Sequence, residues 1–220
     1  MRPPSTRPTV VLLHGLARTR HSLSGLRRTL ERAGFETWAR SYPSRRLSIA
    51  DAAAKITDWI ARDLPGDRPL AAVTHSLGGI LVRHIEAHRA FTRIVMLAPP
   101  NQGSHMAHVL DDHPLYRWFF GPAGQELAAP DQVRAWPQPR APCAVIAGIH
   151  TRAAWHPLNW LTGSRTRFPP GQPNDGIVTV AETRLPDMAA FATIEARHTF
   201  IMNNRRAREL VLRFLQHGTF

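Results

Sequence analysis

The residues Leu70–Gly79, LAAVTHSLGG, place a serine between an apolar run and a pair of glycines. The run before Ser76 predicts a buried strand, and the residues after it predict a helix. A serine at such a turn is typical of a nucleophile elbow, in which a strained strand-to-helix turn raises the hydroxyl clear of the sheet. Small residues are needed two positions on either side, and Gly78 fits, whereas Thr74 stands where glycine is usual. By itself the motif fits equally well a serine that caps a helix.

Apolar runs and helical patterns alternate on both sides of this stretch. Strands separated by helices pair in parallel through right-handed crossovers. We therefore expect an α/β fold with a doubly wound, mostly parallel sheet of about six strands flanked by helices. The expected strands are 9–13, 35–42, 70–74, 92–98, 143–148, 177–180 and 192–196, and the expected helices are 23–33, 50–64, 77–88, 104–111 and 203–216.

Two irregular segments, 99–139 and 151–174, interrupt this alternation and are rich in aromatic residues. Both follow the ends of expected strands, where the ligand crevice of an open parallel sheet lies. Long segments in that position are more often functional than simple connections. We therefore expect a single domain over 1–220 in which these two segments form a small lid or insertion.

The net charge of +12 invites a nucleic-acid interpretation, but the sequence argues against it. Only Lys55 among the 28 basic residues is a lysine, and the arginines are scattered without a long basic run. This usage is typical of a GC-rich genome, so we expect weak attraction to anionic surfaces and no nucleic-acid partner. No segment is long and apolar enough to cross a bilayer or to serve as a signal peptide, which predicts a cytoplasmic protein.

A serine becomes a nucleophile when a base takes its proton and a third group orients that base. Asp175 lies in the turn-rich stretch PNDGIV, and His198 lies between an expected strand and the last helix. An Asn-Asp-Gly turn and a polar helix-entry residue are the structural alternatives for the two. When such a serine attacks a carbonyl group, negative charge develops on the carbonyl oxygen. The backbone amides of Leu77 and of Leu16 are the expected hydrogen-bond donors to that oxygen. His14, beside Leu16, fits a role in bracing that loop better than one as a base.

The segments VVLLHGL, THSLGG, NDG and RHT, together with APPNQGS and DGIVTV, resemble the α/β-hydrolase superfamily, and more narrowly its small bacterial lipase- and esterase-like members. The resemblance runs from Thr9 to the C-terminus. It implies a minimal α/β-hydrolase fold, a Ser76–His198–Asp175 triad, an oxyanion hole formed by the Leu16 and Leu77 amides, and no metal or organic cofactor. The chain order serine, aspartate, histidine is that of this fold. The sequence also lacks His-Glu-x-x-His and cysteine-cluster motifs for zinc.

The expected activity is hydrolysis of carboxylic esters, small-molecule or lipid, through an acyl-enzyme. Acyltransferase, thioesterase and amidase activities share the same triad and stay open, as does a non-catalytic protein that binds a lipid or partner. A haloalkane dehalogenase is disfavoured, because it needs a carboxylate where Ser76 stands. An acyl pocket, or else core packing, is expected from five aromatic residues: Trp118, Phe119, Phe120, Trp155 and Trp160.

Overall fold

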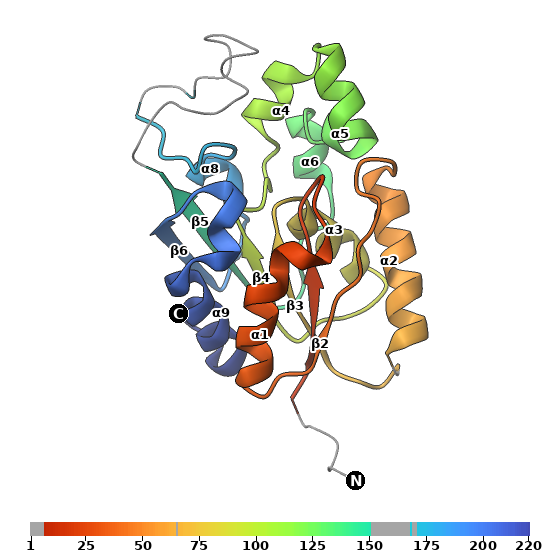
Figure 1. The fold of residues 1–220 in the computed structure, drawn as a ribbon, viewed down its shortest axis with the longest axis vertical. Coiled ribbons are helices and arrows are strands. Elements are labelled where there is room, and N and C mark those ends of the chain that lie inside the picture. The colour runs from red at the N-terminus through yellow and green to blue at the C-terminus, as the bar shows by residue number, and fades with distance from the viewer. Residues whose placement is uncertain (1–6, 65, 151–167, 169–170) are drawn as a thin grey trace.

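Six strands form one parallel sheet within residues 7–64, 66–150, 168 and 171–220, which the computed structural model describes (Figure 1). Their order across the sheet is β2-β1-β3-β4-β5-β6, and every neighbouring pair is parallel. This confirms the predicted fold class. The strands are β1 (Thr9–Leu13), β2 (Thr37–Trp38), β3 (Leu70–His75), β4 (Ile94–Leu97), β5 (Cys143–Ile149) and β6 (Ala190–Glu195).

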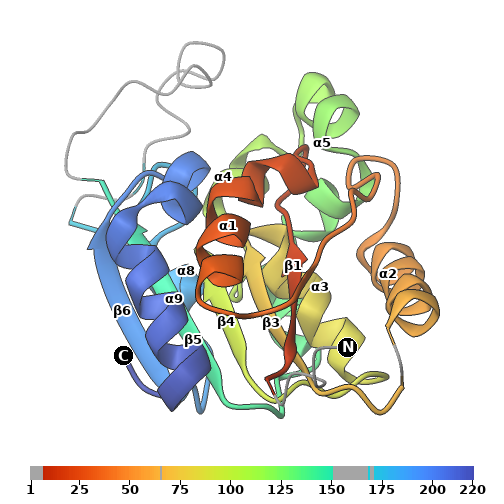
Figure 2. The same cartoon turned by 60° about the horizontal axis from the view of Figure 1, so that its bottom comes forward.

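Helices cover both faces of the sheet, which is why its central strands are apolar on both sides (Figure 2). In β1, Val10 and Leu12 pack in the core cluster that contains the apolar side chains of α1 (Ser24–Arg32) and α9 (Arg205–His217). The alternate residues of β1 pack with α2 (Ile49–Asp63) and α3 (Leu77–Glu86) on the other face. No helix in the described part is long and apolar enough to span a membrane.

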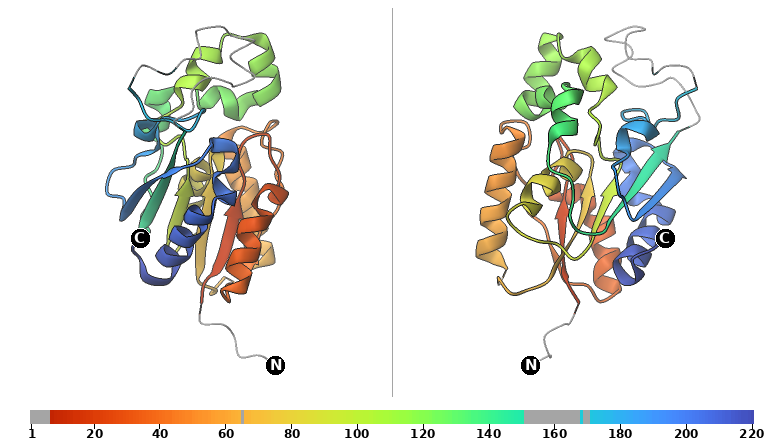
Figure 3. Two further views of the ribbon diagram at one scale, coloured as in Figure 1. Left: turned by 60° about the vertical axis from the view of Figure 1, so that its left-hand side comes forward. Right: turned by 180° about the vertical axis from the view of Figure 1, so that it is seen from behind.

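The expected insertion 99–139 forms three helices beyond the carboxyl ends of the strands (Figure 3). The short helix expected near 104–111 is present as α4 (His105–Leu110), whereas α5 (Pro114–Glu126) and α6 (Pro130–Ala135) were not predicted. Gly121–Pro122 indicates a helix break, and Gly121 has a non-helical φ of 65° inside α5. Most of the second expected lid segment, 151–167 and 169–170, lies outside the described residues.

The side chain of Arg83 ties the insertion to the sheet. It projects from α3, is fully buried, and donates hydrogen bonds to four backbone carbonyls, of Asn101, Val133, Trp136 and Pro137. Burial lowers the pKa of Arg83 to about 10. The guanidinium therefore supplies hydrogen-bond donors to carbonyls that precede α4 and that lie at the C-terminal end of α6.

Two predicted strands were wrong in whole or in part. Residues 177–180 form no strand, because the Asp175 carboxylate accepts hydrogen bonds from the Ile177 and Val178 amides. In addition, Thr179 caps the helix α8 (Val180–Thr183). The predicted strand 35–42 shortens to β2, at the edge of the sheet. Two short 3₁₀ helices, η1 (Arg20–Leu23) and η3 (His198–Asn203), complete the described elements.

The loop after β1 is held by His14, as expected for a bracing residue. The buried His14 ring stacks on Tyr42 with centroids 3.8 Å apart, and its Nε2 accepts from the Tyr42 amide at 3.2 Å. The Tyr42 hydroxyl donates to the His14 carbonyl. Because the amide binds only a neutral Nε2, this contact favours the uncharged ring, and burial lowers the pKa of His14 to about 4.

Replacing Arg83 by methionine should destabilise the fold by roughly 3 kcal/mol, because four buried carbonyls lose their donor. Urea unfolding of Arg83→Met measures this loss. Arg213→Met is the matched control, since Arg213 is exposed on α9 and its loss should change stability by less than about 0.5 kcal/mol. Equal effects of the two changes would contradict the anchoring role of Arg83.

The neutral His14 should also make stability depend on pH. Between its folded pKa of about 4 and the ordinary value of 6.5, the unfolded chain binds a proton that the folded chain does not. The free energy of unfolding therefore falls as pH falls through this window. Between pH 7 and pH 5 the wild type should lose about 2 kcal/mol more than His14→Gln. Urea unfolding at both values tests this, and parallel losses in the two proteins would refute it.

Candidate active site

Ser76 occupies a strained turn between β3 and α3. Its φ of 53° and ψ of −123° lie in a region that residues other than glycine rarely adopt. The turn is forced by the close approach of α3 to β1, since a Cβ on Gly78 would lie 2.6 Å from the Leu13 carbonyl oxygen. The Ser76 amide donates to the Leu97 carbonyl at 2.9 Å, which fixes the turn to β4. The serine hydroxyl is therefore presented at the carboxyl edge of the sheet.

Thr74, which stands where glycine is usual, lies beside the second glycine of the motif. Thr74 is fully buried, and Gly79 rather than residue 74 makes the tight contact, since a Cβ there would lie 2.7 Å from the Pro99 Cβ. That same Cβ position lies 3.5 Å from the Thr74 hydroxyl oxygen. The second glycine of the motif is thus required by its approach to Pro99, and Thr74 lies at ordinary van der Waals distance from it.

The three residues expected to act together meet in space. The Nε2 of His198 lies 2.9 Å from the Ser76 hydroxyl, and its Nδ1 lies 2.7 Å from the Asp175 carboxylate. Asp175 is 3% exposed and His198 is 8% exposed. The hydroxyl, the imidazole and the carboxylate therefore form one hydrogen-bonded chain, although the three residues lie far apart in the sequence.

The Asp175 carboxylate is held by the turn that contains it. One oxygen accepts from the Ile177 and Val178 amides at 3.0 and 2.8 Å, and the other faces His198. The His198 amide donates to the Asp175 carbonyl at 3.0 Å. Gly148 of β5 allows this packing, because a Cβ there would lie 2.8 Å from the Asp175 Cβ. The carboxylate that contacts His198 is thus also the group that stabilises the turn.

His75 contacts His198, and the sequence did not predict this contact. Its Nε2 lies 3.0 Å from the His198 carbonyl, to which it donates, and the two rings are 5.0 Å apart. Burial lowers the pKa of His75 well below its usual value, so its ring is neutral. The remaining Nδ1 has no hydrogen-bond partner within the described chain and faces Gly15, where a Cβ would lie 2.9 Å away.

The two expected oxyanion donors belong to segments that adjoin Ser76. Leu77 is the first residue of α3, so its amide has no acceptor within the helix. Leu16 belongs to the loop after β1, and that loop approaches the serine so closely that a Cβ on Gly15 would lie 3.2 Å from the Ser76 Cβ. The loop is tightened at Ala17, whose φ is 56° and whose amide donates to the Ser44 hydroxyl at 3.1 Å.

The expected acyl-pocket aromatics are only partly brought together. Trp118 and Phe119 lie on α5 and are 75% and 42% exposed, while Phe120 is half-buried and packs against Tyr116. Trp155 and Trp160 lie outside the described residues.

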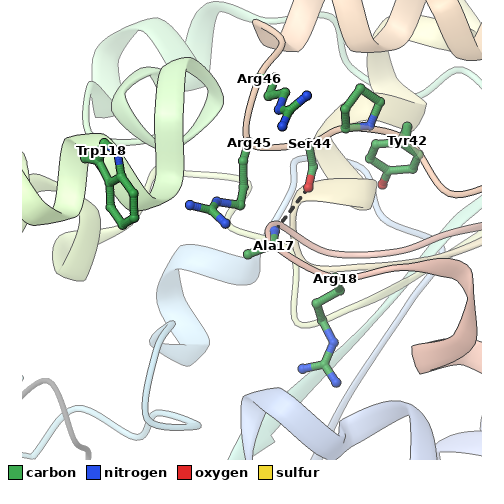
Figure 4. A pocket seen from close by; sticks show the side chains of 8 residues that line it. Ala17, Arg18, Tyr42, Ser44, Arg45, Arg46 and Trp118 are labelled. Carbon is green, nitrogen blue, oxygen red and sulfur yellow. Dashed lines mark hydrogen bonds between the residues drawn. The ribbon is translucent and has the colours of Figure 1, made fainter.

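A pocket of about 450 Å³ opens beside the loop after β1, and sequence reasoning missed it (Figure 4). It is lined by residues 42–46 together with Ala17, Arg18 and Trp118, and we call it the arginine pocket. The only signal in the sequence was the pair Arg45-Arg46. Within the described ranges, no three His, Cys, Asp or Glu side chains are grouped as metal ligands.

Solved structures resemble the whole chain at low identity. The mature form of the lipase BlEst2 from Bacillus licheniformis matches with a TM-score of 0.73 and 19% identity over 97% of this chain and 94% of its own. A metagenomic carboxyl esterase matches with a TM-score of 0.71 and 19% identity, over 97% and 77%. The phospholipase PlaB from Legionella pneumophila matches with a TM-score of 0.68 and 18% identity, over 98% and 60%. At these identities the likeness concerns the fold.

No curated protein matches the sequence. A family model does, and it covers residues 10–214, from the second residue of β1 into α9. It therefore includes Ser76, Asp175 and His198. Nearly the full length of the chain is matched, and on that basis the protein belongs to the alpha/beta hydrolase family.

Proposed function

We propose that this protein is a serine hydrolase that cleaves carboxylic esters through an acyl-enzyme. The observation that carries the proposal is the continuous chain from the Ser76 hydroxyl through the His198 imidazole to the Asp175 carboxylate, at 2.9 and 2.7 Å. The similarity of the fold to a lipase and to a carboxyl esterase supports esters as the substrate class.

In the first half of the reaction, His198 Nε2 takes the proton of the Ser76 hydroxyl while the serine oxygen attacks the ester carbonyl carbon. Asp175 holds the proton on Nδ1, which leaves the Nε2 lone pair directed at the serine, and it stabilises the imidazolium that forms. When the tetrahedral intermediate collapses, His198 returns the proton to the leaving alkoxide and an acyl-Ser76 ester remains.

The negative charge on the carbonyl oxygen is stabilised by the backbone amides of Leu16 and Leu77. Both are fixed before substrate arrives, because Gly15 packs against Ser76 and Leu77 opens α3. In the second half, His198 takes a proton from water as the water oxygen attacks the acyl carbon. The bond from that carbon to the serine oxygen then breaks, and His198 returns the proton to restore the Ser76 hydroxyl. The products are a carboxylic acid and an alcohol.

Ser76 should react covalently with a fluorophosphonate probe, because the hydroxyl beside a neutral imidazole is the activated nucleophile. Mass spectrometry of the labelled protein should locate the probe on Ser76, and Ser76→Ala should neither be labelled nor hydrolyse nitrophenyl esters. Its activity should fall on the order of 10⁶-fold. Ser41→Ala, a change at an exposed serine, is the control and should label normally. Intact labelling of Ser76→Ala would remove the proposed nucleophile.

Asp175→Asn should reduce kcat by about 10⁴-fold because it inverts the histidine tautomer. The amide oxygen of the asparagine has to face the Ile177 and Val178 donors, so its NH₂ group faces His198 and demands an unprotonated Nδ1. The Nε2 then carries the proton and no longer accepts one from serine. Asp187→Asn, at an exposed position with φ 51°, is the matched control. Near-normal turnover by Asp175→Asn, with an unchanged melting temperature, would contradict this role.

A further inference from the structure

The arginine pocket and the proposed reaction site share the loop after β1. Ala17 and Arg18 directly follow Leu16, and the same loop packs against Ser76 through Gly15. Leu16, the expected oxyanion donor, is therefore the chain neighbour of the residues that begin the lining of this pocket. Figure 4 shows Arg45 between Trp118 and Ala17, with Arg18 extending on the other side of Ala17.

Three guanidinium groups line this pocket without a carboxylate among its lining residues. All sixteen acidic residues of the sequence lie within the described part, and the ion pairs formed there use other basic groups. Like charges gathered without counter-ions repel each other and raise the local positive potential. An anion bound beside Arg18 and Arg45 would relieve that repulsion.

Arg45 is held in place before any ligand arrives. Its Nε donates to the Phe119 carbonyl, and its guanidinium lies 4.2 Å from the centroid of the Phe119 ring. Gly121, at the kink in α5, makes this approach possible, because a Cβ there would overlap the Arg45 carbonyl oxygen. The guanidinium therefore loses little conformational freedom on binding an anion.

Arg18 brings positive charge close to the reacting groups. Its Nε is buried and has no hydrogen-bond partner within the described residues, and burial lowers the pKa of its guanidinium. The charge also lowers the pKa of His75, the neighbour of Ser76 in the chain. A cation that is partly removed from water attracts an anion more strongly than an exposed one does.

We propose that the ester substrate carries an anionic group, a phosphate or a carboxylate, that binds between Arg18 and Arg45 in the arginine pocket while the ester carbonyl faces Ser76. This inference rests on the proposed function and narrows its substrate class from esters in general to anionic esters. The anionic group can belong to the alcohol or to the acyl part of the ester.

Two matched pairs of esters test the proposal and separate these two sources. Butanoylglycerol phosphate against butanoylglycerol places the anion on the alcohol, and nitrophenyl hemiglutarate against nitrophenyl pentanoate places it on the acyl chain. For at least one pair, kcat/KM should be about tenfold or more higher for the anionic member at low ionic strength. Added potassium chloride should lower this ratio, because exposed charges are screened by salt.

Arg18→Met and Arg45→Met should each lower the ratio of anionic to neutral kcat/KM by about tenfold. Arg213→Met removes the same charge from the exposed side of α9 and should leave the ratio as in the wild type. Circular dichroism and melting temperatures establish that the variants are folded. Equal kcat/KM within both pairs, or a preference that survives both pocket changes, overturns the inference and leaves ester hydrolysis standing.

Absence of turnover on all four esters would instead count against the proposed function. Calorimetric titration of Ser76→Ala with each of the four esters then tests the pocket without chemistry. In at least one pair, the anionic ester should bind at least about tenfold more tightly than its neutral partner, and adding Arg45→Met should abolish that difference. Equal affinities within both pairs overturn the inference.

Discussion

The structure of the site depends on the contact between the start of α3 and β1. A side chain at Gly78 would collide with the Leu13 carbonyl, so helix and strand touch through their backbones. The chain leaving β3 can enter such a helix only through a residue with positive φ, and Ser76 takes that conformation. An L-residue keeps it only where the surrounding packing enforces it. The position of the hydroxyl is thus a consequence of helix-to-sheet packing.

Around this turn, buried polar groups serve the fold and the proposed chemistry together. Asp175 is almost fully buried, a state that a carboxylate tolerates only when its oxygens are satisfied. Two amides of its own turn and the His198 imidazole satisfy them. His75 fills the space between His198 and the loop after β1 as a neutral ring. The His198 imidazole is consequently held by Asp175, and the His198 backbone by His75, before substrate binds.

Much of this arrangement was predictable from the sequence because it depends on local patterns. Apolar runs predicted the buried strands, and the serine with its following glycines predicted the turn at Ser76. The prediction failed at 177–180, where an apolar run has its amides bound by the Asp175 side chain instead of a neighbouring strand. It also missed α5, because a Gly-Pro pair usually ends a helix, and here Gly121 kinks one.

The sequence by itself determined the alternation of strands and helices, the serine followed by two glycines at a strand-to-helix turn, and the chain order of serine, aspartate and histidine. The first two are patterns among residues that are neighbours in the chain, whereas the strain at Ser76 comes from the packing of α3 on β1. The tertiary structure alone decided that His75 contacts His198 and that Arg18, Arg45 and Trp118 line one pocket. These residues come from separate loops and a helix, and their proximity follows from how those elements pack, which no local pattern encodes.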